Sequence, residues 1–145
     1  MTTNLLIQLL AALATVESGN NPEAHGREGE RGLYQFTAAA WKDCTDLRVK
    51  MGLPVYPFEG AHTQAFAREY AMTWLWHIES EIHYEQPRSQ KVSVDAILSA
   101  WNCGLTRMRK IGYDHRRAPR TTRAFITRVF RQMGWIGPVL HTDKK

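Results

Sequence analysis

The sequence predicts a mainly α-helical protein that forms one domain over residues 1–145. Apolar residues recur three and four positions apart along most of the chain, which places them on one face of a helix. Alternation of apolar and polar residues, the pattern of a half-buried strand, is scarce. No internal repeat, low-complexity tract or linker divides the 145 residues, a length typical of one domain.

The expected elements follow from apolar stripes and capping residues. Five leucines and a valine share one stripe over residues 4–16. A loop rich in Gly, Asn and charge is expected over 20–32, with at most a small hairpin near 26–36. Thr37 and Ser93 are typical N-caps, and the basic segment after the Ser93 helix is expected to be a loop. We expect helices over residues 4–16, 37–50, 60–83 and 93–101, and a last helix from Thr121 or Thr122 to Met133.

Three features carry expectations about compartment and metals. Cys44 and Cys103 are too few for a disulfide framework, and we expect packed free thiols, with a pair left open. The apolar N-terminal stretch lacks a basic n-region and a cleavage site and is too short to cross a membrane, so we expect neither a signal peptide nor a span. The arrangement of His77, Glu81 and His83 matches no ligand pattern, so no metal and no cofactor are expected.

Glu17 is the strongest chemical candidate. It ends an apolar helix and is followed by the turn-forming sequence Ser18-Gly19-Asn20-Asn21-Pro22. A carboxyl at the end of a buried helix has a raised pKa, because burial disfavours its charged form, and it then acts as a general acid near neutral pH. The plain alternative is a solvated Glu before a helix stop at Ser18–Gly19.

Three segments make the chain resemble the lysozyme-like superfamily, specifically SLT-type lytic transglycosylases and related phage-type muramidases. Residues 14–26 (ATVESGNNPEAHG) are similar to the helix that ends in Glu-Ser-Gly. Residues 29–41 (GERGLYQFTAAAW) resemble the Gly-Leu-Met-Gln segment and its following helix. Residues 99–104 (SAWNCG) match Ala-Tyr-Asn-Ala-Gly with Trp for Tyr, and residues 121–129 (TTRAFITRV) are a weaker match. The resemblance implies a lysozyme-like helical fold with an active-site cleft.

The resemblance implies a reaction for Glu17. Glu17 protonates the glycosidic oxygen between N-acetylmuramic acid and N-acetylglucosamine in peptidoglycan, while the substrate's N-acetyl carbonyl stabilises the cationic sugar. The ionised Glu17 then removes a proton from the muramic C6 hydroxyl, which closes a 1,6-anhydro ring. Peptidoglycan strands are therefore the expected partner, and a monomer is the expected state.

The resemblance also implies five substrate-binding residues, Ser18, Tyr34, Gln35, Trp101 and Asn102. Ser18 is expected to orient the catalytic carboxyl or the substrate. Tyr34 and Gln35 are expected to line the cleft. Asn102 is expected to hold the N-acetyl group or the catalytic Glu, with Trp101 as a wall or stacking surface.

Two departures from the family pattern concern the last segment. Thr121 stands where the family has Glu, and Phe125 stands where a Tyr commonly contacts the catalytic Glu. A Phe cannot donate that hydrogen bond, so Tyr34 or Tyr113 is the expected substitute donor.

Two alternatives stay open for the activity. A hydrolytic muramidase would use Glu17 with a second carboxylate that activates water, at separations of roughly 6.5–9.5 Å for inversion or about 5–5.5 Å for retention. The candidates are Glu28, Glu30, Asp43 and Asp46, with the two loop glutamates preferred. The other alternative is a protein that binds cell wall or nucleic acid without turnover.

The C-terminal third of the chain is strongly basic. The net charge is +5 and the pI is about 9.5, which favours anionic partners. One acid, Asp114, accompanies nine basic residues: Arg107, Arg109, Lys110, Arg116, Arg117, Arg120, Arg123, Arg128 and Arg131. A solvated face or attraction to an anionic cell wall is expected. No nucleic acid is expected, because no recognition motif is present. Without a signal peptide, we expect synthesis in the cytoplasm and delivery to the wall by a pore, a virion or a secretion machine. A phage-encoded protein fits this expectation.

Overall fold

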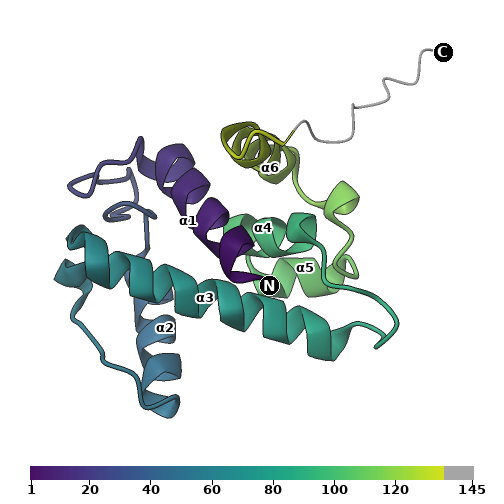
Figure 1. Cartoon of the computed structure of the whole chain (residues 1–145), viewed down its shortest axis with the longest axis horizontal. Coiled ribbons are helices and arrows are strands. Elements are labelled where there is room, and N and C mark those ends of the chain that lie inside the picture. Colours follow the sequence, from purple (N-terminus) through teal and green to yellow (C-terminus); the bar gives the residue numbers. More distant parts are fainter. Residues whose placement is uncertain (136–145) are drawn as a thin grey trace. The chain divides into compact units, whose positions relative to one another are not determined.

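The computed structural model describes residues 1–135, which contain six α-helices, two short 3-10 helices and no strand (Figure 1). In chain order the elements are α1 (Thr3–Ser18), α2 (Ala38–Lys50), η1 (Phe58–His62), α3 (Gln64–Glu85), α4 (Val94–Cys103), α5 (Leu105–Lys110), η2 (His115–Arg117) and α6 (Arg120–Gln132). The mainly α-helical fold is therefore confirmed.

The chain divides into two compact units, Met1–His77 and the part that begins at Ile78, and α3 runs through the boundary. A single domain over residues 1–145 stays a prediction, and its last ten residues lie outside the described part. No helix within residues 1–135 is both long and apolar enough to span a bilayer.

In the first unit, side-chain hydroxyls cap the starts of α1 and α2, and the cap at Thr37 was predicted from the sequence. The Thr2 hydroxyl accepts a hydrogen bond from the Leu5 amide (3.3 Å) at the start of α1. The Thr37 hydroxyl accepts one from the Ala40 amide (3.1 Å) at the start of α2. Each cap satisfies an amide that has no partner inside its helix. The leucine stripe of α1 is buried as expected, with Leu9, Leu10 and Leu13 in the core.

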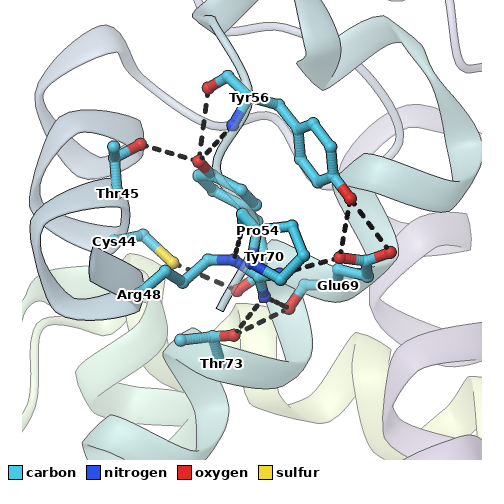
Figure 2. Close-up of polar contacts among 8 residues, drawn as sticks. All are labelled: Cys44, Thr45, Arg48, Pro54, Tyr56, Glu69, Tyr70 and Thr73. Atoms are coloured by element: carbon cyan, nitrogen blue, oxygen red, sulfur yellow. Dashed lines mark hydrogen bonds and ion pairs between the residues drawn. The ribbon is translucent and has the colours of Figure 1, made fainter. Parts of the chain in front are cut away.

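An aromatic stack joins α2 to α3 in this unit. The Trp41 ring stacks on Tyr70 with 3.7 Å between centroids, and its Nε1 donates to the Tyr56 carbonyl at 2.9 Å. Trp41 is thus a core residue rather than an exposed sugar platform. The Tyr70 hydroxyl also accepts a hydrogen bond from the Tyr56 amide and contacts the Thr45 hydroxyl at 2.8 Å (Figure 2).

Arg48 is buried beside this stack. Its guanidinium donates to the Pro54 carbonyl (2.8 Å), the Thr73 hydroxyl (2.7 Å) and the Glu69 carboxylate (2.7 Å) (Figure 2). It also lies 5.0 Å from the centroid of the Tyr70 ring. A buried charge is tolerated only when it is paired and hydrogen-bonded, and these contacts meet that condition. They also fix the 51–57 connection against α3.

In the second unit, α4 contacts α5, α6 and η2. The Ser93 hydroxyl caps α4 by accepting from the Ala96 amide at 3.1 Å, as predicted. The expectation of an irregular loop after α4 is wrong, because this segment contains α5 and η2. Within α5 only Met108 is buried. The six-residue helix therefore lacks the repeating apolar stripe that identifies longer helices.

Candidate active site

Glu17 lies in the last turn of α1 and is partly exposed. The helix ends immediately after Ser18, where Gly19 and Asn20 both adopt left-handed backbone angles with φ of 64° and 61°. The Gly19 amide donates to the Thr15 carbonyl at 2.9 Å, which satisfies an acceptor of the last turn. The chain therefore reverses sharply next to Glu17, and the loop follows directly.

Ser18 fixes this reversal. Its hydroxyl donates to the Ala14 carbonyl at 3.0 Å and accepts from the Asn21 amide at 3.1 Å. The single proton of the hydroxyl is thus used within the turn. This assigns Ser18 to the shape of the turn and leaves it no proton to donate to a carboxylate in this arrangement.

The loop between α1 and α2, visible in Figure 1, is held by backbone hydrogen bonds. The Gly26 amide donates to the Glu30 carbonyl at 2.8 Å, and Arg31 and Phe36 exchange two hydrogen bonds of 2.9 and 3.1 Å. The small hairpin allowed near residues 26–36 is present only as isolated bridges, His25 with Arg31 and Arg31 with Phe36. The loop has a defined backbone without forming a strand.

The same loop is attached to η1 in two places. A Cβ on Gly32, whose φ is 79°, would lie 1.8 Å from the Ala61 carbonyl oxygen, so both the backbone angle and the close approach require glycine. His62 Nδ1 forms a hydrogen bond of 2.9 Å with the Pro22 carbonyl, and the His62 ring lies 4.7 Å from that of His25. These contacts fix the loop that follows Glu17.

Tyr34 and Gln35 lie at the turn of this loop. Tyr34 is only 3% exposed. Burial raises the pKa of its hydroxyl, and the opposing effect of a hydrogen bond from Arg68 is smaller. Gln35 has φ of 50°, a strained angle for a residue with a side chain. Its amide group donates to the carbonyls of Gly32 (2.9 Å) and Ala24 (3.3 Å). The strained backbone and these bonds give the Gln35 side chain one orientation.

The candidate second carboxylates have different surroundings. Glu30 is partly buried, and its carboxylate accepts a hydrogen bond of 3.0 Å from the Glu28 amide. Asp46 forms an ion pair of 2.8 Å with Lys42. Glu28 and Asp43 are exposed.

Asn102 and Trp101 belong to the second unit, at the end of α4. The Asn102 carbonyl oxygen accepts a hydrogen bond of 2.8 Å from the hydroxyl of Thr122 in α6, which is buried. The Asn102 NH2 group therefore faces other partners as a donor. Trp101 is partly exposed. Sequence reasoning missed Thr122 as the residue that orients Asn102, although it lies in the weakly matched segment 121–129.

Tyr113, one of the two tyrosines expected to supply the missing hydroxyl, has another hydrogen-bond acceptor. The Tyr113 hydroxyl donates to Glu85, so the expectation that it contacts Glu17 is wrong. Phe125, in the position of the family Tyr, is buried at 2% exposure in the core of the second unit. Both residues stabilise the second unit.

A partly exposed carboxyl at a helix end, followed by a fixed loop, is a candidate general acid, which defines the protein as a candidate enzyme. The chain belongs to the transglycosylase SLT domain family, whose model matches residues 2–122. This range contains all the site residues predicted from the sequence. The protein is accordingly a peptidoglycan-cleaving enzyme with a lysozyme-like fold. No curated protein matches the sequence.

Proposed function

We propose that the protein is a lytic transglycosylase in which Glu17 is both the general acid and the general base. The observation that carries this proposal is the position of Glu17, partly buried in the last turn of α1 and directly before the left-handed turn at Gly19 and Asn20. Glu17 is partly exposed at this helix end, and a general acid must be within reach of the substrate oxygen that it protonates. Membership in the transglycosylase SLT family supports the same role.

The reaction has two proton transfers through one carboxyl group. In the first, the Glu17 carboxylic acid gives its proton to the glycosidic oxygen, the bond to the muramic C1 breaks, and the N-acetyl carbonyl stabilises the positive C1. In the second, the Glu17 carboxylate takes the proton of the muramic C6 hydroxyl, and this oxygen bonds to C1. The enzyme returns to its starting protonation state, and no water is consumed.

The other site residues have positioning and binding roles in this proposal. The Asn102 NH2 group, oriented by Thr122, donates a hydrogen bond to the N-acetyl carbonyl of the substrate. Trp101 supplies an apolar surface for a sugar ring. Tyr34 and Gln35 shape the loop beside Glu17, and the strained, hydrogen-bonded Gln35 does so with little freedom.

A hydrolytic mechanism has weaker support. It requires a second carboxylate that activates water, whereas membership in the transglycosylase SLT family supports a reaction through Glu17 alone. Glu28 is exposed, so burial does not prepare it for general-base catalysis. Reducing N-acetylmuramic acid ends among the products would nevertheless establish hydrolysis.

Mass spectrometry of the products released from isolated peptidoglycan tests the proposal. Wild-type protein is expected to release fragments with 1,6-anhydro ends, each one water lighter than the reducing form. Glu17→Gln is expected to release no product above background, with a free energy of unfolding within about 1 kcal/mol of the wild type. The matched control is Glu23→Gln, which neutralises an exposed carboxyl of the same loop.

The variants separate the possible outcomes. Persistent cleavage by Glu17→Gln would contradict the assignment of Glu17. Reducing ends, together with activity lost in Glu28→Gln or Glu30→Gln, would replace the transglycosylase reaction with hydrolysis. Loss of cleavage in Glu23→Gln would show that cleavage depends on the charge of the loop, and not specifically on proton transfer by Glu17.

A further inference from the structure

Helix α6 has one face made of arginines. Its apolar face is buried in the second unit by Thr122, Phe125, Ile126 and Val129. The opposite, exposed face carries Arg120, Arg123, Arg128 and Arg131, which we call the α6 arginine face. At 100° and 1.5 Å per residue, the four positions fall within an arc of about 140° and extend along about 16 Å of the helix. The charges therefore form a stripe parallel to the helix axis.

The α6 arginine face has no counter-charge within residues 1–135. None of its four guanidinium groups makes an ion pair there, and α6 itself contains no acid. Other arginines of the same unit are paired: Arg109 with Glu85 (2.6 Å) and Arg116 with Asp114 (2.9 Å). Arg107, Lys110 and Arg117 of the neighbouring α5 and η2 are also without an ion pair within residues 1–135. What distinguishes α6 is that four such charges share one face of a single helix.

This arrangement works against the stability of the helix. Arg120 and Arg123 lie in the first turn, where the positive end of the helix dipole favours acids. The same two residues, and also Arg128 with Arg131, are three positions apart and repel each other. Of the four, Arg131 lies in the last turn, where the dipole favours a cation. For the other three charges, an external anion is the partner that makes them favourable.

The chemistry of the face selects the kind of anion. Short side chains, Ala124 and Thr127, are exposed between the arginines, so the guanidinium groups are the contacting atoms. Guanidinium pairs with carboxylate or phosphate through two parallel hydrogen bonds. Insertion into a bilayer requires an exposed apolar helix face, and the apolar face of α6 is buried.

We propose that the α6 arginine face binds the carboxylates of the peptide stems of peptidoglycan. The proposal rests on the peptidoglycan-cleaving function and adds a second contact with the same polymer, separate from the glycan contacts of Glu17. Peptide carboxylates repeat along a glycan strand, and a stripe of cations about 16 Å long offers several simultaneous ion pairs. Weak single pairs then sum to a useful affinity.

Co-sedimentation with isolated peptidoglycan tests this contact in the Glu17→Gln background, where turnover does not interfere. The test variant adds Arg120→Gln, Arg123→Gln, Arg128→Gln and Arg131→Gln. The control adds Lys42→Gln, Lys50→Gln, Arg88→Gln and Lys91→Gln, four exposed positions outside α6. Both variants lower the net charge of the Glu17→Gln protein by four, from +6 to +2, since the wild type has 19 basic and 14 acidic residues. We expect the test variant to bind at least about tenfold more weakly and the control to change less than about twofold.

A second measurement needs no arginine variant. Peptidoglycan whose peptide carboxylates have been converted to amides is expected to bind the Glu17→Gln protein about as weakly as native peptidoglycan binds the test variant. Unchanged binding to the amidated polymer would overturn the proposal, and so would equal weakening by the test and control variants. Duplex DNA retained only by proteins with an intact α6 face, with unchanged peptidoglycan binding, would assign the face to nucleic acid instead.

The two proposals fail separately. If Glu17→Gln still cleaves peptidoglycan, the catalytic assignment is wrong, but amidated and native polymer still measure the α6 contact. On glycan strands freed of peptides, the four arginine substitutions placed in the otherwise wild-type enzyme are expected to leave cleavage unchanged. Lost cleavage there would show that α6 serves the active site and not the peptides.

Discussion

Each of the two units contains a glutamate that accepts hydrogen bonds from one arginine and one tyrosine. In the first unit, Glu69 accepts from Arg48 (2.7 Å) and Tyr56 (3.2 Å) (Figure 2). In the second, Glu85 accepts from Arg109 (2.6 Å) and from Tyr113. The residue types are the same, but the buried member differs.

The two clusters differ in which side chain is buried. The Arg48 side chain is 4% exposed, whereas that of Arg109 is 43% exposed. In the second cluster the buried partner is Tyr113, which is 7% exposed. An exposed ion pair contributes little because water solvates both charges, while a buried donor or charge is costly to leave without its partner. Burial, rather than the presence of an ion pair, thus identifies the residue on which each cluster depends.

The largest expected effect is that of Arg48→Met. The substitution removes the hydrogen bonds to Pro54 and Thr73 and the ion pair with Glu69. We expect a loss of about 2–4 kcal/mol in the free energy of unfolding, below the value for a fully buried pair because Glu69 is partly exposed. Urea denaturation followed by circular dichroism measures it. The control is Lys42→Met, which breaks the exposed ion pair with Asp46 and is expected to leave the free energy of unfolding almost unchanged. Equal losses for the two variants would contradict the comparison.

Tyr113→Phe is expected to have an intermediate effect. It removes the hydroxyl that donates to Glu85 while the buried ring stays, which predicts a loss of about 1–2 kcal/mol at neutral pH. Burial raises the pKa of Glu85, but the hydrogen bonds from Tyr113 and Arg109 outweigh it and lower the pKa below 4.5. A lowered carboxyl pKa stabilises the fold above the ordinary pKa and loses this effect as pH falls through the folded value.

The pH dependence therefore separates this contact from simple packing. The stability difference between wild type and Tyr113→Phe is expected to be full at pH values above the ordinary Glu pKa of 4.5 and to shrink as Glu85 becomes protonated. Unfolding measured in a pH series checks this. A difference that stays constant through the acidic range would assign the effect of Tyr113 to packing alone.

Arg109→Gln is expected to have the smallest effect. Its side chain is largely hydrated, and Tyr113 still donates to Glu85 after the substitution. We expect a loss in the free energy of unfolding well below that of Tyr113→Phe at low salt, falling toward zero in about 1 M salt, where exposed charges are screened. The effect of Arg48→Met should persist at the same salt concentration. A larger loss for Arg109→Gln than for Tyr113→Phe would reverse the comparison.

Local patterns carried much of the fold prediction. The leucine stripe placed α1, and the hydroxyls of Thr37 and Ser93 placed the starts of α2 and α4. Helix α5 was not predicted, because the six residues between Gly104 and Ile111 are too few to show an apolar repeat at helical spacing. Helix α3 was expected from residue 60, but the chain forms η1 first, and α3 begins at Gln64.

Contacts between residues far apart in the sequence could not be predicted from local sequence patterns. Arg48 in isolation is typical of a solvated helix position, and only the fold brings Pro54 and Thr73 to its guanidinium. For the candidate site, the position of Glu17 at a helix end was predicted from the sequence. The hydrogen bond that the Ser18 hydroxyl makes within the turn was not predicted. Tyr113 was assigned to the wrong carboxylate, because its partner Glu85 lies 28 positions away in the sequence.

The two free cysteines differ as sites for chemical labelling. Burial raises the pKa of the Cys44 thiol to about 12, and this thiol contacts the Tyr70 carbonyl at 3.4 Å. Its reactive thiolate is therefore scarce, and reagents have no access to it. Cys103 is partly exposed and directly follows Asn102. A thiol-specific fluorophore will thus attach at Cys103 in preference to Cys44, which places a reporter in the unmodified sequence next to Asn102, the residue proposed to bind the substrate.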